Sequence, residues 1–209
     1  MFKFLSVTMD QLKLKHPFSL LAAGPSGSGK TMFIKNVIEH RMIHPFPGKI
    51  IWCYGAYQPL YDQMSGIEFI DGLPENLNSL TNSLIIIDDL MSELGSDVRL
   101  TKLFTKGCHH RNLSVIFIVQ NLFHKGIREM SLNANYLVIF KNTRDKSQVI
   151  HLGKQLYPGK TKFFQEVYQD ATSKAFSYLL IDLKPDTSDA LRLRTGLFPG
   201  DKYYVYQPR

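Results

Sequence analysis

A glycine-rich segment of the chain carries residue types that can bind phosphate. Residues 24–31 read Gly-Pro-Ser-Gly-Ser-Gly-Lys-Thr and fit the pattern G-x-x-x-x-G-K-[ST]. Glycines at these positions let consecutive backbone N–H groups turn inward and hold phosphate oxygens. The amine of Lys30 can reach the β- and γ-phosphates, and the hydroxyl of Thr31 can hold Mg²⁺. This P-loop, or Walker A motif, predicts binding of a nucleoside triphosphate by Gly24, Pro25, Ser26, Gly27, Ser28, Gly29, Lys30 and Thr31.

The flanks of this loop have the patterns that the motif needs. The apolar run 18–23 precedes the loop, and residues 32–40 follow it with apolar side chains at helical spacing. A strand, a glycine loop and a helix N-terminus are therefore predicted, with the positive end of the helix dipole facing the bound phosphates.

Two acids end a second apolar run. Residues 84–87 read Leu-Ile-Ile-Ile, too uniform for a half-exposed strand, and Asp88 and Asp89 follow. In isolation such a pair also fits a solvated turn. Beside a P-loop it fits a Walker B motif, in which Asp88 holds Mg²⁺ and Asp89, close to the attacking water, acts as general base.

A third buried strand is predicted at 114–119, and Gln120 and Asn121 follow it. If this strand lies beside the P-loop strand, the amide of Gln120 can bind the γ-phosphate or orient the lytic water. A turn cap by Asn121 explains the pair equally well.

Composition sets further limits on the class of protein. The 209 residues carry a formal charge of +7, 44% are hydrophobic, and only two are cysteines. No apolar stretch approaches eighteen residues and the start lacks a signal-peptide core, so we expect a soluble intracellular protein without a membrane partner. Two cysteines favour a reducing compartment, and Cys108 with the adjacent histidines 109–110 lacks the spacing of a zinc site. The positive charge favours a polyanionic partner besides the nucleotide.

Apolar runs and helical patterns alternate along the chain. Further strands are predicted at 49–54, 67–70, 136–141, 178–182 and 203–206, and helices at 97–106, 145–156 and 162–170. The pattern predicts one three-layer α/β/α domain with a mainly parallel central sheet and the ligand at the carboxyl ends of the strands. We expect an N-terminal extension at 1–16, a core at 17–183 and a C-terminal extension at 184–209.

The chain resembles the additional-strand class of P-loop ATPases, of the RecA and FtsK type. Within it, the chain is similar to the FtsK–HerA superfamily, in particular the genome-packaging ATPases of Polinton-like and adintovirus-type DNA viruses and their poxvirus relatives. The resemblance extends from about 17 to 195 and is carried by residues 24–31, 85–89, 109–121, 136–145 and 178–185.

This resemblance implies a homo-oligomeric ring that uses ATP and Mg²⁺ to drive double-stranded DNA into a capsid, docked on a capsid or portal protein in an infected cell. Such rings complete each site with an arginine from the neighbouring subunit. Arg111 occupies the matching position, with Arg128 and Arg144 as substitutes. Cellular FtsK-type motors usually have Glu where this chain has Asp89, which puts the general base in doubt, and Glu93 is a possible replacement.

Three other functions fit a P-loop chain of this size. A viral superfamily-3 helicase would have a helical oligomerisation domain, for which there is no room before residue 18. A nucleotide or small-molecule kinase would need a lid of clustered arginines, for which only Arg192 and Arg194 are available. A nucleotide-gated scaffold would bind ATP and turn it over poorly. Basic residues at 102–110 and 141–162 are candidates for contacts with DNA, but a solvated helix face explains them equally well.

Overall fold

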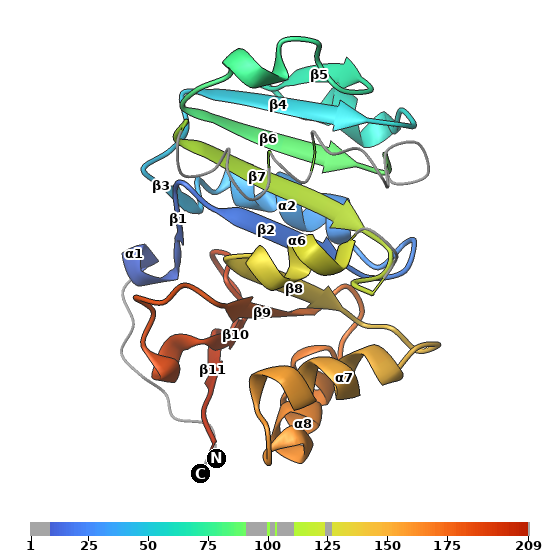
Figure 1. The fold of residues 1–209 in the computed structure, drawn as a ribbon, viewed down its shortest axis with the longest axis vertical. Coiled ribbons are helices and arrows are strands. Elements are labelled where there is room, and N and C mark those ends of the chain that lie inside the picture. The colour runs from blue at the N-terminus through green and yellow to red at the C-terminus, as the bar shows by residue number, and fades with distance from the viewer. Residues whose placement is uncertain (1–8, 91–99, 101–102, 104–110, 124–126, 209) are drawn as a thin grey trace.

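A nine-stranded sheet forms the centre of the molecule (Figure 1). The structure is a computed structural model and describes residues 9–90, 100, 103, 111–123 and 127–208. In spatial order the strands are β11 (Tyr204–Tyr206), β10 (Leu193–Thr195), β9 (Tyr178–Asp182), β8 (Tyr136–Phe140), β2 (Ser19–Ala23), β7 (Leu113–Val119), β6 (Ser83–Asp88), β4 (Lys49–Tyr54) and β5 (Glu68–Asp71).

The central strands are parallel and buried on both faces. β8, β2, β7, β6, β4 and β5 pair in parallel, and every residue of β2, β6, β7 and β8 is buried. Their sequences are uniformly apolar because a strand covered by helices on both faces has no side exposed to solvent. β7 lies between the P-loop strand β2 and the acid-ended strand β6, which confirms the predicted additional-strand architecture.

The far end of the sheet differs from the expected pattern. β9 runs antiparallel to β8, β10 antiparallel to β9, and β11 antiparallel to β10. β10 was not predicted, because its sequence Leu-Arg-Thr has a charge at its centre. That charge is neutralised inside the protein, where Arg194 Nη2 lies 2.7 Å from Asp182 Oδ2 and both side chains are buried.

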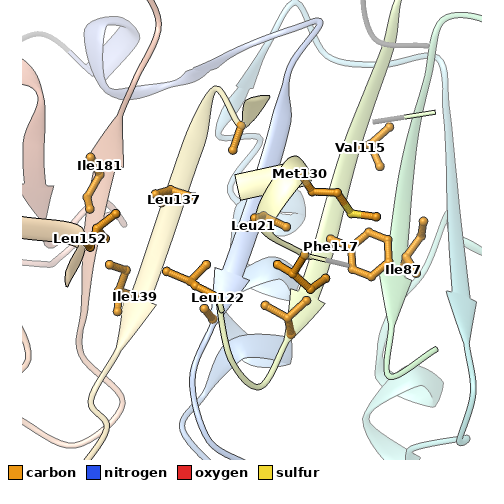
Figure 2. Packing of buried hydrophobic residues seen from close by; sticks show 14 of the residues in the cluster. Leu21, Ile87, Val115, Phe117, Leu122, Met130, Leu137, Ile139, Leu152 and Ile181 are labelled. Carbon is orange, nitrogen blue, oxygen red and sulfur yellow. The ribbon is translucent and has the colours of Figure 1, made fainter. Parts of the chain in front are cut away.

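Helices cover the two faces of the sheet. α2 (Lys30–Glu39) packs on one face, and α6 (Ile127–Asn133), α7 (Ser147–Leu156) and α8 (Thr161–Ala171) contribute to the apolar cluster of the other (Figure 1). Met130 of α6 packs over the sheet together with Leu21 and Phe117 (Figure 2). The predicted three layers are therefore present, although α6 was not predicted.

Smaller elements complete the described part of the chain. They are α1 (Met9–Leu12), β1 (Leu14–Lys15), β3 (Ile43–His44) and the 3₁₀ turns η1 (Pro59–Gln63), η2 (Leu77–Ser79) and η4 (Asp189–Leu191), and β1 pairs with β3. Nothing among the described helices has the length and apolar character of a membrane span. Glu93 and Cys108 lie outside the described residues, as do the predicted helix 97–106 and the basic stretch 102–110 apart from residues 100 and 103.

Candidate active site

The P-loop follows β2 at the carboxyl edge of the sheet, as predicted. Gly24 N–H donates to the carbonyl of Val119 at 3.2 Å, so the loop is fixed to the end of β7. A Cβ on Gly24 would lie 2.7 Å from Phe140 Cβ and from Ser28 Oγ, which leaves no space for a side chain. Gly29, directly before α2, has a φ of 101°, a conformation that L side chains rarely adopt. Glycine is therefore required at both positions by sterics as well as by phosphate access.

Lys30 begins α2 and folds back along the loop. Its Nζ donates to the carbonyl oxygens of Gly24 at 2.7 Å and Pro25 at 2.9 Å. Burial lowers the pKa of Lys30, while the charges of Asp88 and Asp89 act in the opposite direction. The charges of the two acids therefore act on the lysine.

Asp88 ends β6 and is almost completely buried, with 3% of its surface exposed. The hydroxyl of Tyr61 in η1 donates to Asp88 Oδ2 at 3.0 Å. Burial raises the pKa of the Asp88 carboxyl, Tyr61 and Lys30 lower it, and Asp89 adds a second upward contribution. The carboxyl of Asp88 is thus held by the Tyr61 hydroxyl at the carboxyl end of β6.

Asp89 leaves the strand in a left-handed backbone conformation. Its φ is +56°, and its side chain is exposed. The turn is closed by Gly55, whose N–H donates to the Asp88 carbonyl at 3.1 Å. A Cβ on Gly55 would lie 2.7 Å from the carbonyl oxygen of Asp89. The chain thus turns sharply after Asp88, which separates the buried acid from the exposed one.

Gln120 and Asn121 follow β7 on the same edge, and they behave differently. Gln120 is exposed and follows the strand directly, beside the P-loop. Asn121 accepts a hydrogen bond from the Phe123 N–H at 2.7 Å, which is the turn cap that the sequence left open. Gln120 therefore stays a candidate for contact with the γ-phosphate or the lytic water.

The oxygen donors of Thr31 and Asp88 fit the requirements of Mg²⁺. Mg²⁺ takes one or two protein oxygens, completes its shell with water and phosphate oxygens, and disfavours nitrogen or sulfur. Among the described residues, no group of three or more His, Cys, Asp or Glu side chains is suited to a tighter metal site. A hydroxyl and a carboxylate beside a phosphate-binding loop are the donor set expected for Mg²⁺ bound together with a nucleotide.

Arg111 lies at the opposite edge of the sheet from the P-loop. It precedes the seven residues of β7, which span about 23 Å at about 3.3 Å per residue. Its Nη1 donates to the carbonyl of Leu77 at 2.8 Å. The side chain therefore cannot reach phosphates bound in its own subunit. Of the two substitutes, Arg144 follows the carboxyl end of β8, and Arg128 lies in the first turn of α6.

The analysis of the sequence missed Tyr61. Tyr61 lies in η1 and is only 2% exposed. It packs among Trp52, Tyr54 and Phe69, with ring centroids 4.9–5.5 Å apart. The tyrosines at 54, 57 and 61 were a visible signal, but only the fold brings the third hydroxyl to Asp88.

Comparisons with known proteins bear on the fold. No protein-family model matches the chain, and no curated protein matches its sequence. Among solved structures, the genome packaging NTPase B204 from Sulfolobus turreted icosahedral virus 2, in complex with AMP, matches with a TM-score of 0.53 at 13% identity, over 81% of this chain and 94% of that one. The fold is that of a P-loop NTPase.

Two further neighbours share this P-loop NTPase fold. B204 described as the DNA-packaging ATPase from Sulfolobus Turreted Icosahedral Virus matches over 92% of this chain and 98% of that one, with a TM-score of 0.53 and 12% identity. The pCW3 conjugation coupling protein TcpA, solved with ATPγS, matches over 82% of this chain and 59% of that one, with a TM-score of 0.50 and 14% identity. The predicted likeness to viral packaging ATPases and FtsK-like proteins is confirmed at the level of the fold.

Proposed function

We propose that the chain is a Mg²⁺-dependent ATPase that moves double-stranded DNA during viral genome packaging. The observation that carries the ATPase activity is the meeting of four groups at one sheet edge. Lys30 lies in the P-loop after β2, Asp88 ends β6 and Asp89 follows it, and Gln120 follows β7, which lies between β2 and β6. DNA packaging is supported by the likeness to B204, which covers nearly the whole of both chains.

Each residue has a chemical role in this proposal. The P-loop N–H groups and Lys30 bind the phosphates, and Thr31 and Asp88 would hold Mg²⁺, which neutralises charge on the β- and γ-phosphates. Asp89 accepts a proton from water as its oxygen attacks the γ-phosphorus, and the bond to the β–γ bridging oxygen breaks to release ADP. Gln120 orients that water. The exposure of Asp89 and Gln120 leaves both side chains accessible to water and nucleotide.

Arg111 acts in a neighbouring subunit in this proposal, within a homo-oligomeric ring. Its distance from the P-loop of its own subunit supports a role in trans over one in cis. The test mixes two inactive variants, Lys30→Ala and Arg111→Ala. A mixed ring contains interfaces where an intact P-loop faces an intact arginine, so mixing should restore part of the ATPase rate. If the mixture stays as inactive as its components, the trans assignment is wrong.

Double-stranded DNA and a capsid or portal protein are the proposed partners. The excess of positive charge favours DNA, and nonspecific phosphate contacts should weaken steeply with salt. The deciding experiment measures ATPase rate with and without linear double-stranded DNA at low and moderate salt, with Lys30→Ala as control. Stimulation of several-fold that disappears with salt supports the motor. A rate indifferent to DNA favours a kinase or a nucleotide-gated scaffold instead.

A further inference from the structure

A cleft of about 990 Å³ opens beside the P-loop. Its lining includes Gly29 and Lys30 of the P-loop, Gln58 from the loop after β4, and residues of the segments 173–178 and 195–206. Drug-sized ligands and cofactors bind in clefts of about 300–1,000 Å³. The cleft is therefore continuous with the phosphate site and large enough for the rest of a nucleotide.

The order of the strands sets the direction in which a nucleotide must lie. Asp88 and Asp89 come from β6, so the γ-phosphate end faces β7 and β6. A nucleoside triphosphate is linear, with the base at the end opposite the γ-phosphate. The base must then lie toward β8, β9 and β10, where the segments 173–178 and 195–206 line the cleft.

Phe176 projects into this region from the loop between α8 and β9. Phe140 and Tyr178 are register partners on β8 and β9, which brings the loop to the P-loop edge. A Cβ on Gly29 would lie 3.2 Å from Phe176 Cβ, so the phenylalanine lies directly against the P-loop backbone. The side chain is 70% exposed, the largest exposure among the large apolar side chains that the structure describes.

The backbone of Phe176 is strained as well. Its φ of +60° is in the left-handed region, which costs a residue with a bulky side chain about 1–2 kcal/mol. Strained and exposed apolar residues cluster at ligand sites, where a bound group uses the surface that they present. An aromatic ring at the base end of a nucleotide cleft presents a flat surface on which a base can stack.

We propose that Phe176 is the nucleobase-stacking residue of this ATPase. The inference rests on the proposed nucleotide-binding function and adds the residue that holds the base by its face. Because every nucleobase has a π face, such a contact supports binding without strict selection among bases. The charged residues Lys174, Lys202, Asp170 and Asp201 also line the cleft.

The test compares ATP with inorganic tripolyphosphate, which offers the same phosphates without a base. Dissociation constants for both ligands with Mg²⁺ are measured by calorimetry for the wild type, Phe176→Ala and Phe176→Trp. Phe176→Ala should weaken ATP binding by about 5- to 150-fold, the range expected for one base–aromatic stack, and leave tripolyphosphate within about twofold. Phe176→Trp should retain tight ATP binding, with indole emission that responds to ATP and not to tripolyphosphate.

Two controls separate stacking from general damage. Leu132→Ala removes another highly exposed apolar side chain, on α6, and should leave both constants unchanged. Phe176→Gly removes the left-handed strain, so its melting temperature should not fall while its ATP affinity does.

The remaining outcomes contradict the inference. If Phe176→Ala binds ATP like the wild type, or loses ATP and tripolyphosphate equally, the ring does not hold the base. If the wild-type protein binds neither ligand, the proposed nucleotide-binding function itself fails.

Discussion

Tyr61→Phe isolates one hydrogen bond to the acid that would hold Mg²⁺. The substitution removes the hydroxyl that donates to Asp88 Oδ2 at 3.0 Å and keeps the ring that stacks on Phe69. Both partners are buried, with 2% and 3% of their surfaces exposed, so water cannot readily replace the lost donor. A hydrogen bond to a charged group is worth about 1.5–3 kcal/mol.

The expected cost to Mg²⁺ binding follows from this figure. Removing a hydrogen-bond partner of a metal ligand typically weakens metal affinity about 10- to 100-fold, which is about 1.4–2.7 kcal/mol and agrees with the loss of one such bond. We therefore expect the Mg²⁺ concentration for half-maximal ATPase activity to rise by that factor in Tyr61→Phe. Maximal activity at saturating Mg²⁺ should change less, because Asp88 itself remains.

A pH profile distinguishes this effect from a structural defect. The Tyr61 hydroxyl lowers the pKa of Asp88, so its removal raises that pKa further and lets protons compete with Mg²⁺ at higher pH. At low Mg²⁺ the activity of the variant should decline earlier than that of the wild type as the pH falls. Tyr57→Phe is the matched control, because its hydroxyl bonds to the exposed Asp62 and the residue is 54% exposed. A wild-type Mg²⁺ dependence and pH profile in Tyr61→Phe would refute the reasoning.

Three further substitutions test the charges of the site and of the sheet. Asp88→Asn should abolish Mg²⁺-dependent turnover and raise the melting temperature near neutral pH, as measured by calorimetry. Burial raises the pKa of Asp88, so ionisation of its carboxyl costs the native state stability as the pH rises through that pKa. The gain in melting temperature should therefore vanish in acid. Asp89→Asn should keep nucleotide affinity and lose turnover, as measured by equilibrium binding beside single-turnover hydrolysis, and equal rates would move the general base elsewhere. Arg194→Met removes the ion-pair partner of the buried Asp182, which should lower the free energy of unfolding in denaturant by about 3–5 kcal/mol. Adding Asp182→Leu should recover most of that loss. A small effect of Arg194→Met alone would show that the ion pair is not needed.

The sequence predicted the central sheet well for a physical reason. β2, β6, β7 and β8 are buried on both faces, so their apolar runs are uninterrupted and their ends carry the polar groups of the site. The strand β4 matches its predicted bounds of 49–54 for the same reason. A local pattern suffices where both faces of a strand face helices.

Other features depend on contacts distant in sequence and left no local pattern. β10 places Arg194 in the core only because Asp182 of β9 lies beside it. Tyr61 acts on an acid 27 positions later in the chain. The P-loop, Asp88 and Asp89 could be found from spacing alone, whereas the contact made by Tyr61 required the fold.

A residue with left-handed backbone conformation lies at each end of the proposed nucleotide site. Five described residues other than glycine have positive φ: Arg41, Asn82, Asp89, Asn112 and Phe176. Asparagine adopts this conformation at little cost, and Arg41 follows the end of α2, where a left-handed residue commonly ends a helix. Phe176 has neither explanation, and Asp89 only in part, since aspartate tolerates the conformation. In the proposed binding mode Asp89 lies at the γ-phosphate end of the nucleotide and Phe176 at the base end. The two left-handed residues are therefore the ones whose exposed side chains would contact the nucleotide. Glycine at position 176 would adopt this conformation without strain but would offer no ring for stacking. The presence of a phenylalanine there, in spite of the strain, therefore argues that its ring contacts a ligand.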